Sequence, residues 1–190
     1  MDLKMKKQIL AIAIGATLAL PLMAQAEGFY VGGNVGSAKH KLSDSQESIN
    51  ENDTGYKVYG GIAINKYFGA ELGYADFGSY TESDSSGSYE ASAKSTYLAA
   101  TGTYTITQQF SIFGKVGVAF NKAKYSVTGS GFSASASGDN TNLLLGIGAA
   151  YAFTPNMSVV AEYEDFGKVD KLDGAEYKVN MLSVGLRYKF

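Results

Sequence analysis

The sequence predicts an all-β fold, a closed antiparallel eight-stranded transmembrane β-barrel with short periplasmic turns and long extracellular loops. Three observations lead to this fold class. First, apolar residues alternate with small or polar ones in about eight segments. Second, short and long connections alternate between these segments. Third, the last segment ends on an aromatic residue.

The final segment, Tyr177 to Phe190, shows the alternation most clearly. Apolar side chains at Val184, Leu186, Tyr188 and Phe190 alternate with small or charged ones, which is typical of a strand with one apolar and one polar face. The last strand of an outer-membrane barrel can place a terminal ring in the interfacial aromatic girdle, whereas a soluble protein seldom ends on an exposed Phe.

The amino terminus predicts export. Lysines precede an apolar run, Ile9 to Met23, which is followed by the small-x-small sequence Ala24-Gln25-Ala26. This arrangement predicts a signal peptide over residues 1–26, cleaved after Ala26, and an outer-membrane barrel domain over residues 27–190. The run is shorter than the ~20 residues of a transmembrane helix. Met1 and Met5 both leave a basic segment before it, so either can be the start.

The composition limits the chemistry. The chain has no cysteine, which excludes disulfides and thiol catalysis. Its net charge of −2, without a basic cluster, argues against nucleic acid as a partner. High Gly and Tyr content with few prolines is typical of closely packed strands.

The expected strands are about ten residues long, which suits a tilted crossing of a bilayer. They cover residues 29–38, 55–64, 67–77, 95–104, 110–122, 142–151, 157–166 and 177–190. Three connections are short, whereas 39–54, 78–94, 126–140 and 167–176 are long and polar. This asymmetry is typical of outer-membrane barrels. The Ser-, Gly- and Ala-rich stretch 128–138 predicts a mobile loop.

Bulky apolar residues gather on one face of these strands, and small residues with a few charges on the other. A soluble sandwich or lipocalin-like barrel would turn the bulky face inward. Because an eight-stranded barrel is narrow, we expect small side chains inside and bulky ones against lipid. The predicted outer belt comprises Phe29, Val31, Tyr56, Ile62, Leu72, Tyr74, Leu98, Ile112, Val118, Leu145, Ile147, Val159, Tyr163, Leu186, Tyr188 and Phe190.

Several stretches resemble the OmpA-like transmembrane domain, a family of small eight-stranded outer-membrane β-barrels. They are residues 29–33 (FYVGG), 60–74 (GGIAINKYFGAELGY), 151–155 (YAFTP), 162–163 and 181–190, and their order and spacing together carry the resemblance. It implies a single-chain barrel in the outer membrane of a Gram-negative bacterium. It also implies that Tyr188 and Phe190 form the insertion signal read by the barrel-insertion machinery. The peptidoglycan-binding domain of larger members is not expected here.

The alternation places six charges in the lumen: Lys57, Glu71, Lys115, Glu162, Glu164 and Arg187. Glu71 and Lys115 match charged gate positions of a well-known family member, whereas other gate partners fall on uncharged positions such as Thr101 and Ala150. Buried charges are normally paired. Two interpretations stay open, a neutral polar plug or a narrow gated ion pore lined by Lys115, Glu71 and Glu162.

No catalytic residue, cofactor or metal site is predicted. His40 is the only histidine, and no Gly-x-Ser-x-Gly nucleophile motif is present. Asp44, Glu47, Glu51 and Asp53 make the first long connection acidic, but they lack the spacing of a dedicated calcium loop.

The long loops give a third interpretation. Aromatic residues near their tips are suited to anchor a ligand, although they also suit the upper girdle: Tyr80, Tyr89, Tyr125 and Phe132. The predicted function is a non-enzymatic structural or surface component of the cell outer membrane, with a gated pore or an adhesin as alternatives. The predicted partners are outer-membrane lipid and lipopolysaccharide, the insertion machinery, and a host or matrix surface ligand.

Overall fold

The computed structural model describes residues 28–43, 48–84, 87–129, 132–172 and 175–190. These residues form eight strands: β1 (Gly28–Ser43), β2 (Ser48–Ala63), β3 (Phe68–Asp84), β4 (Gly87–Thr105), β5 (Phe110–Gly129), β6 (Phe132–Ala152), β7 (Met157–Leu172) and β8 (Ala175–Lys189). No helix in the described part of the chain is long and apolar enough to cross a membrane.

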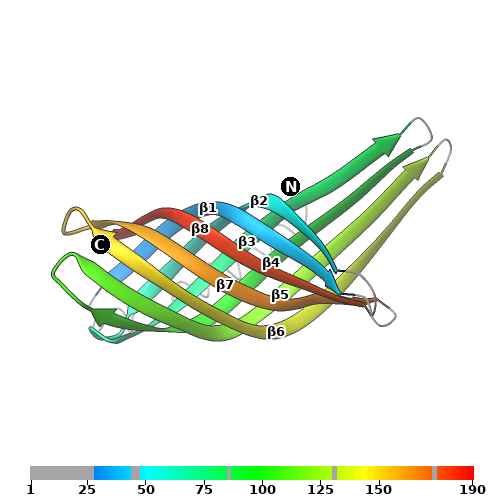
Figure 1. Ribbon diagram of the computed structural model, residues 1–190. Coiled ribbons are helices and arrows are strands. Elements are labelled where there is room, and N and C mark those ends of the chain that lie inside the picture. Colours follow the sequence, from blue (N-terminus) through cyan, green and yellow to red (C-terminus); the bar gives the residue numbers. More distant parts are fainter. Residues whose placement is uncertain (1–27, 44–47, 85–86, 130–131, 173–174) are drawn as a thin grey trace, which may run out of the picture.

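The strands close into one antiparallel barrel in sequence order (Figure 1). The first and last strands complete it, with Val31 opposite Tyr188 and Val35 opposite Val184. Where all eight strands pair, closure leaves no sheet edge, as lipid requires, because the bilayer core offers no partner for a free backbone amide. The predicted fold class is therefore confirmed.

Alternation along every strand separates the two faces as expected. Bulky apolar side chains point outward and stay exposed, for example Leu72 at 59% and Ile147 at 66%, whereas their chain neighbours Glu71 and Gly146 point inward. Of the predicted belt, only Phe29 and Ile62 are half-buried rather than exposed.

The expectation of small side chains inside was wrong in one respect, because large aromatic residues also fill the lumen. Direct cross-strand pairs join an inward aromatic to an inward glycine: Tyr30 to Gly61, Tyr59 to Gly32, Tyr97 to Gly73 and Phe113 to Gly148. A Cβ added to any of these glycines would lie 2.2–2.4 Å from the facing ring. Each ring thus lies over a backbone without a side chain, an arrangement that covers glycine in a sheet.

The loops that join the strands are also shorter than the sequence predicted. Most of residues 39–54, 78–94, 126–140 and 167–176 continue the strands as paired hairpins, including the Ser- and Ala-rich stretch, where Val127 pairs with Ala134. The β3–β4 and β5–β6 hairpins project furthest beyond the barrel (Figure 1). Backbone hydrogen bonding continues the ladder without an apolar belt, which is why polar composition alone did not reveal these strands.

Candidate functional site in the barrel lumen

The structure brings the six predicted lumen charges together. Lys57 lies on β2, Glu71 on β3, Lys115 on β5, Glu162 and Glu164 on β7, and Arg187 on β8. Each is an inward position in the alternation of its strand, and the register between the strands of the closed barrel brings them within reach of one another.

Lys115 is the centre of this cluster. Its Nζ donates to Glu71 Oε1 at 2.6 Å, to Glu162 Oε2 at 3.0 Å and to Glu164 Oε1 at 3.3 Å. All four side chains are fully buried. One ammonium thereby uses its three donors on three carboxylates, which is the full capacity of a lysine.

Lys57 and Arg187 complete the ion network. The Nζ of Lys57 contacts Glu162 and lies 2.5 Å from Glu164 Oε2. Arg187 Nη2 lies 3.4 Å from Glu162 Oε1 and 4.0 Å from Glu71 Oε2. Three cations thus face three carboxylates, and the cluster has no net charge. Neutrality is the condition under which charges remain ionised in a site that excludes water.

Two tyrosines belong to the site and were not predicted as part of it. Tyr97 donates its hydroxyl to Glu71 Oε1 at 2.8 Å, and Tyr30 donates to Glu71 Oε2 at 3.1 Å. Glu71 therefore accepts from both tyrosines and from Lys115. Both tyrosines are inward positions of their strands, but only the register between strands shows that they reach Glu71.

A repeated tripeptide, which the sequence analysis did not recognise, closes the lumen on the hairpin side. Asp-Phe-Gly occurs at residues 76–78 on β3 and again at 165–167 on β7. In both copies the aspartate accepts from the glycine amide, at 3.1 and 2.8 Å, and the glycine has a positive φ of 85° or 71° at a shift in register. The alternation of β3 and β7 already directs Phe77 and Phe166 inward at these bulges, and their buried rings pack edge to face at 4.8 Å.

Aromatic rings also lie on the opposite side of the ion network, toward the short turns. The guanidinium of Arg187 lies 4.7 Å from the centre of the Tyr30 ring and 4.9 Å from that of Phe113. Its side chain is 17% exposed, more than that of any other member of the network. The ion network is therefore enclosed between two aromatic layers.

The other predicted site residues lie elsewhere. Tyr188 and Phe190 point toward lipid with their ring centres 5.0 Å apart, and Phe190 as a residue is 69% exposed. Ala24, Ala26 and the rest of the predicted signal peptide lie outside the described residues, as do Asp44 and Glu47.

Several other side chains considered for binding are not described, although their backbones lie in strands: His40, Glu51, Tyr80, Tyr89, Tyr125 and Phe132. Within the described ranges, no group of three or more His, Cys, Asp or Glu side chains is placed to hold a metal ion.

The comparison with protein families gives a match over almost the whole chain. Residues 24–190 match the family described as the OmpA-like transmembrane domain. Outer membrane protein A of Yersinia pseudotuberculosis is 28% identical over 98% of this chain and 56% of its own length. Outer membrane protein P5 of Haemophilus influenzae is 30% identical over 98% of this chain and 61% of its own length. The chain thus spans little more than half the length of these relatives.

Solved structures agree on the fold. Ail, the attachment invasion locus protein of Yersinia pestis, in complex with the heparin analogue sucrose octasulfate, is 25% identical with a TM-score of 0.57, over 85% of this chain and 99% of Ail. Neisserial surface protein A gives a TM-score of 0.61 at 22% identity, over 85% of this chain and 97% of its own. The protein is an outer-membrane β-barrel, and it belongs to the OmpA-like transmembrane domain family.

Proposed function

We propose that this protein is a non-enzymatic structural component of the outer membrane, with a closed lumen and a surface-exposed set of hairpins. The observation that carries the proposal is the neutral ion network at the centre of the barrel. Lys57, Glu71, Lys115, Glu162 and Glu164 have fully buried side chains, and aromatic residues lie above and below them.

An open ion path would need charges that water can reach. Conduction requires that an ion enter a binding position and leave it again. Here every carboxylate of the network already has a lysine partner, and the Phe77–Phe166 pair covers the network on the hairpin side. The same pairing leaves none of the three carboxylates of the network accessible to a substrate as a general acid or base, which supports a non-enzymatic role.

Planar-bilayer recording of the refolded protein tests the closed lumen. We expect no discrete conductance steps from the wild type, with heat-dependent gel mobility confirming that the barrel is folded. The Glu71→Ala variant removes the carboxylate that joins Lys115 to both tyrosines, and conductance seen only in this variant would show that the network closes the lumen. Discrete steps from the wild type that change in Glu71→Ala would establish the gated pore and contradict the proposal.

The membrane partners of the proposed role are outer-membrane lipid around the apolar belt, lipopolysaccharide in the outer leaflet and the barrel-insertion machinery. The exposure of Phe190 and its edge contact with Tyr188 support recognition of the last strand by that machinery. The signal peptide over residues 1–26 is part of the same proposal.

A host-surface ligand is the second candidate function, and one observation favours an anionic one. Lys94 on β4 lies directly opposite Lys122 on β5, just above the apolar belt, and Lys124 follows on the same face. Like charges opposite each other are unfavourable, and among the described residues Asp76 at 3.0 Å and Asp139 at 3.8 Å partly offset them. The relative Ail has been solved with a heparin analogue.

Binding to immobilised heparin tests this candidate. We expect retention that decreases as salt rises, and loss of retention when Lys94, Lys122 and Lys124 are all replaced by Gln. A matched control replaces Lys66 and Lys189, which are exposed at the opposite end of the barrel, and it should bind like the wild type. Equal retention of both variants would exclude the lysine group as a glycan site.

A further inference from the structure

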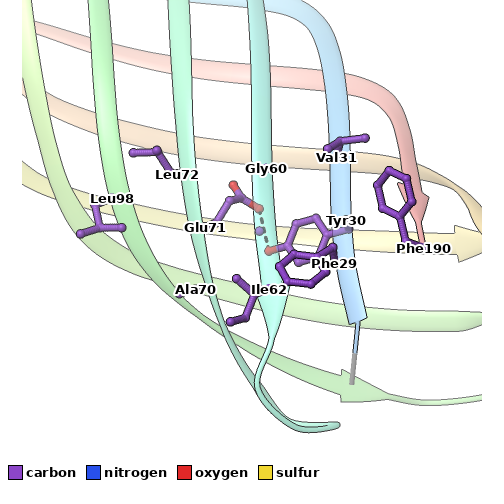
Figure 2. A pocket seen from close by; sticks show the side chains of 11 residues that line it. Phe29, Tyr30, Val31, Gly60, Ile62, Ala70, Glu71, Leu72, Leu98 and Phe190 are labelled. Carbon is purple, nitrogen blue, oxygen red and sulfur yellow. Dashed lines mark hydrogen bonds between the residues drawn. The ribbon is translucent and has the colours of Figure 1, made fainter. Parts of the chain in front are cut away.

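The outer surface of the barrel carries a groove of about 650 Å³ over β1 to β4, beside the carboxyl terminus (Figure 2). Its walls are apolar side chains: Phe29, Val31, Ile62, Leu72, Leu98 and Phe190. The groove lies within the lipid-facing belt rather than in the lumen.

Two small residues on neighbouring strands create the groove. One cross-strand row runs Val31, Gly60, Leu72, and the next row toward the short turns runs Phe29, Ile62, Ala70. Gly60 in one row and Ala70 in the other leave a diagonal depression that passes between Leu72 and Ile62.

The space around position 60 would accept a residue larger than glycine. A Cβ added there would have only Tyr30 O at 3.8 Å and Val31 Cγ1 at 4.0 Å as neighbours, so a larger side chain would fit. The adjacent Gly61 differs, because its Cβ would lie 2.2 Å from the inward Tyr30 ring. Gly60 therefore leaves open space on the outer surface that packing of the barrel does not demand.

The polar atoms near the groove are already satisfied. Tyr30 and Glu71 lie beneath it, but their side chains turn into the lumen and hydrogen-bond to each other at 3.1 Å (Figure 2). The ladder uses the backbone of β1 to β4. An occupant thus finds an apolar surface only, which favours hydrocarbon over any polar ligand.

We propose that this groove holds one acyl chain of a glycerophospholipid from the periplasmic leaflet. The groove is continuous with the belt that contacts lipid, and it lies at the end of the barrel that carries the short turns and the carboxyl terminus. In outer-membrane barrels that end is periplasmic, and glycerophospholipid forms the leaflet there. A flexible chain can follow a diagonal depression between raised side chains, whereas a second rigid barrel would rest on Leu72, Leu98 and Phe190 without filling it.

Native mass spectrometry of the protein, released gently from membranes containing phosphatidylethanolamine and phosphatidylglycerol, tests the proposal. We expect a wild-type adduct of one phospholipid. Gly60→Leu fills the groove and should lose the adduct. Gly114→Leu adds the same side chain at another outward glycine, where the nearest atom to a new Cβ lies 3.8 Å away, and should keep it. Gel mobility shows whether each variant is folded.

A phospholipid with a photoreactive acyl chain gives an independent measurement on the wild type. We expect labelling concentrated on residues 29–31, 60–62 and 70–72 rather than spread around the belt. Even labelling, equal adducts in the two leucine variants, a lipopolysaccharide adduct, or a wild-type dimer that Gly60→Leu disrupts would each overturn the proposal.

Discussion

Replacing Lys115 with methionine is expected to lower the free energy of unfolding of the barrel by about 3–5 kcal/mol, the usual cost of leaving a buried charge without its partner. Lys115 contacts Glu71, Glu162 and Glu164, all of them fully buried. The variant would leave three carboxylates facing only Lys57 and Arg187. Urea unfolding in detergent micelles or vesicles measures the difference.

Two further variants show whether charge balance causes this loss. Adding Glu71→Gln to Lys115→Met restores neutrality and should recover about 0.5–3 kcal/mol, the usual range of coupling between contacting residues. Lys122→Met removes a lysine that is 63% exposed and 3.8 Å from Asp139, and its cost should stay below about 1 kcal/mol. If Lys115→Met were no more costly than Lys122→Met, the ion network would contribute nothing measurable to stability.

Replacing Gly117 with alanine is expected to destabilise the barrel by about 3 kcal/mol or more, at the upper end of the usual cost of overpacking. The new Cβ would lie 2.2 Å from Leu98 O and 2.6 Å from Ala99 Cα. Both are backbone atoms of the paired strand, so no side-chain rotation relieves the contact. The two strands would have to separate at this point of the β4–β5 ladder.

Gly114→Ala is the matched control, because it lies on the same strand but faces outward. The nearest atom to its new Cβ is Gly146 O at 3.8 Å. We expect this variant to be as stable as the wild type or up to about 1 kcal/mol more stable, since alanine loses less conformational freedom than glycine on folding. Refolding yield and urea midpoints distinguish the two variants, and similar values for both would contradict the close approach of β4 and β5 at Gly117.

The alternation of side chains was sufficient to predict the faces of the strands. A period of two depends only on the backbone of each strand. It therefore predicts Leu72 and Ile147 on the lipid face, and Lys115 and Glu162 in the lumen, without knowledge of which strands pair. The same argument predicted that all six lumen charges would share the interior. It could not show which of them touch.

Hairpin length was not predictable in the same way. The segments 78–94 and 126–140 have a composition typical of loops, yet most of their residues pair as extensions of β3 to β6. Beyond the membrane neither face must be apolar, so the signal that identifies a transmembrane strand disappears while the hydrogen-bonded ladder continues.

The sequence by itself therefore determined the fold class, the lipid-facing belt and the inward direction of each lumen charge, because these depend on local periodicity. Only the tertiary structure decided the register between strands. Register placed Tyr97 opposite Gly73 and within reach of Glu71. It brought the two Asp-Phe-Gly bulges together, so that Phe77 packs on Phe166. It also set Gly60 beside Val31, where the outer groove opens. These contacts join residues distant in the chain, and closure of the barrel fixes them all at once.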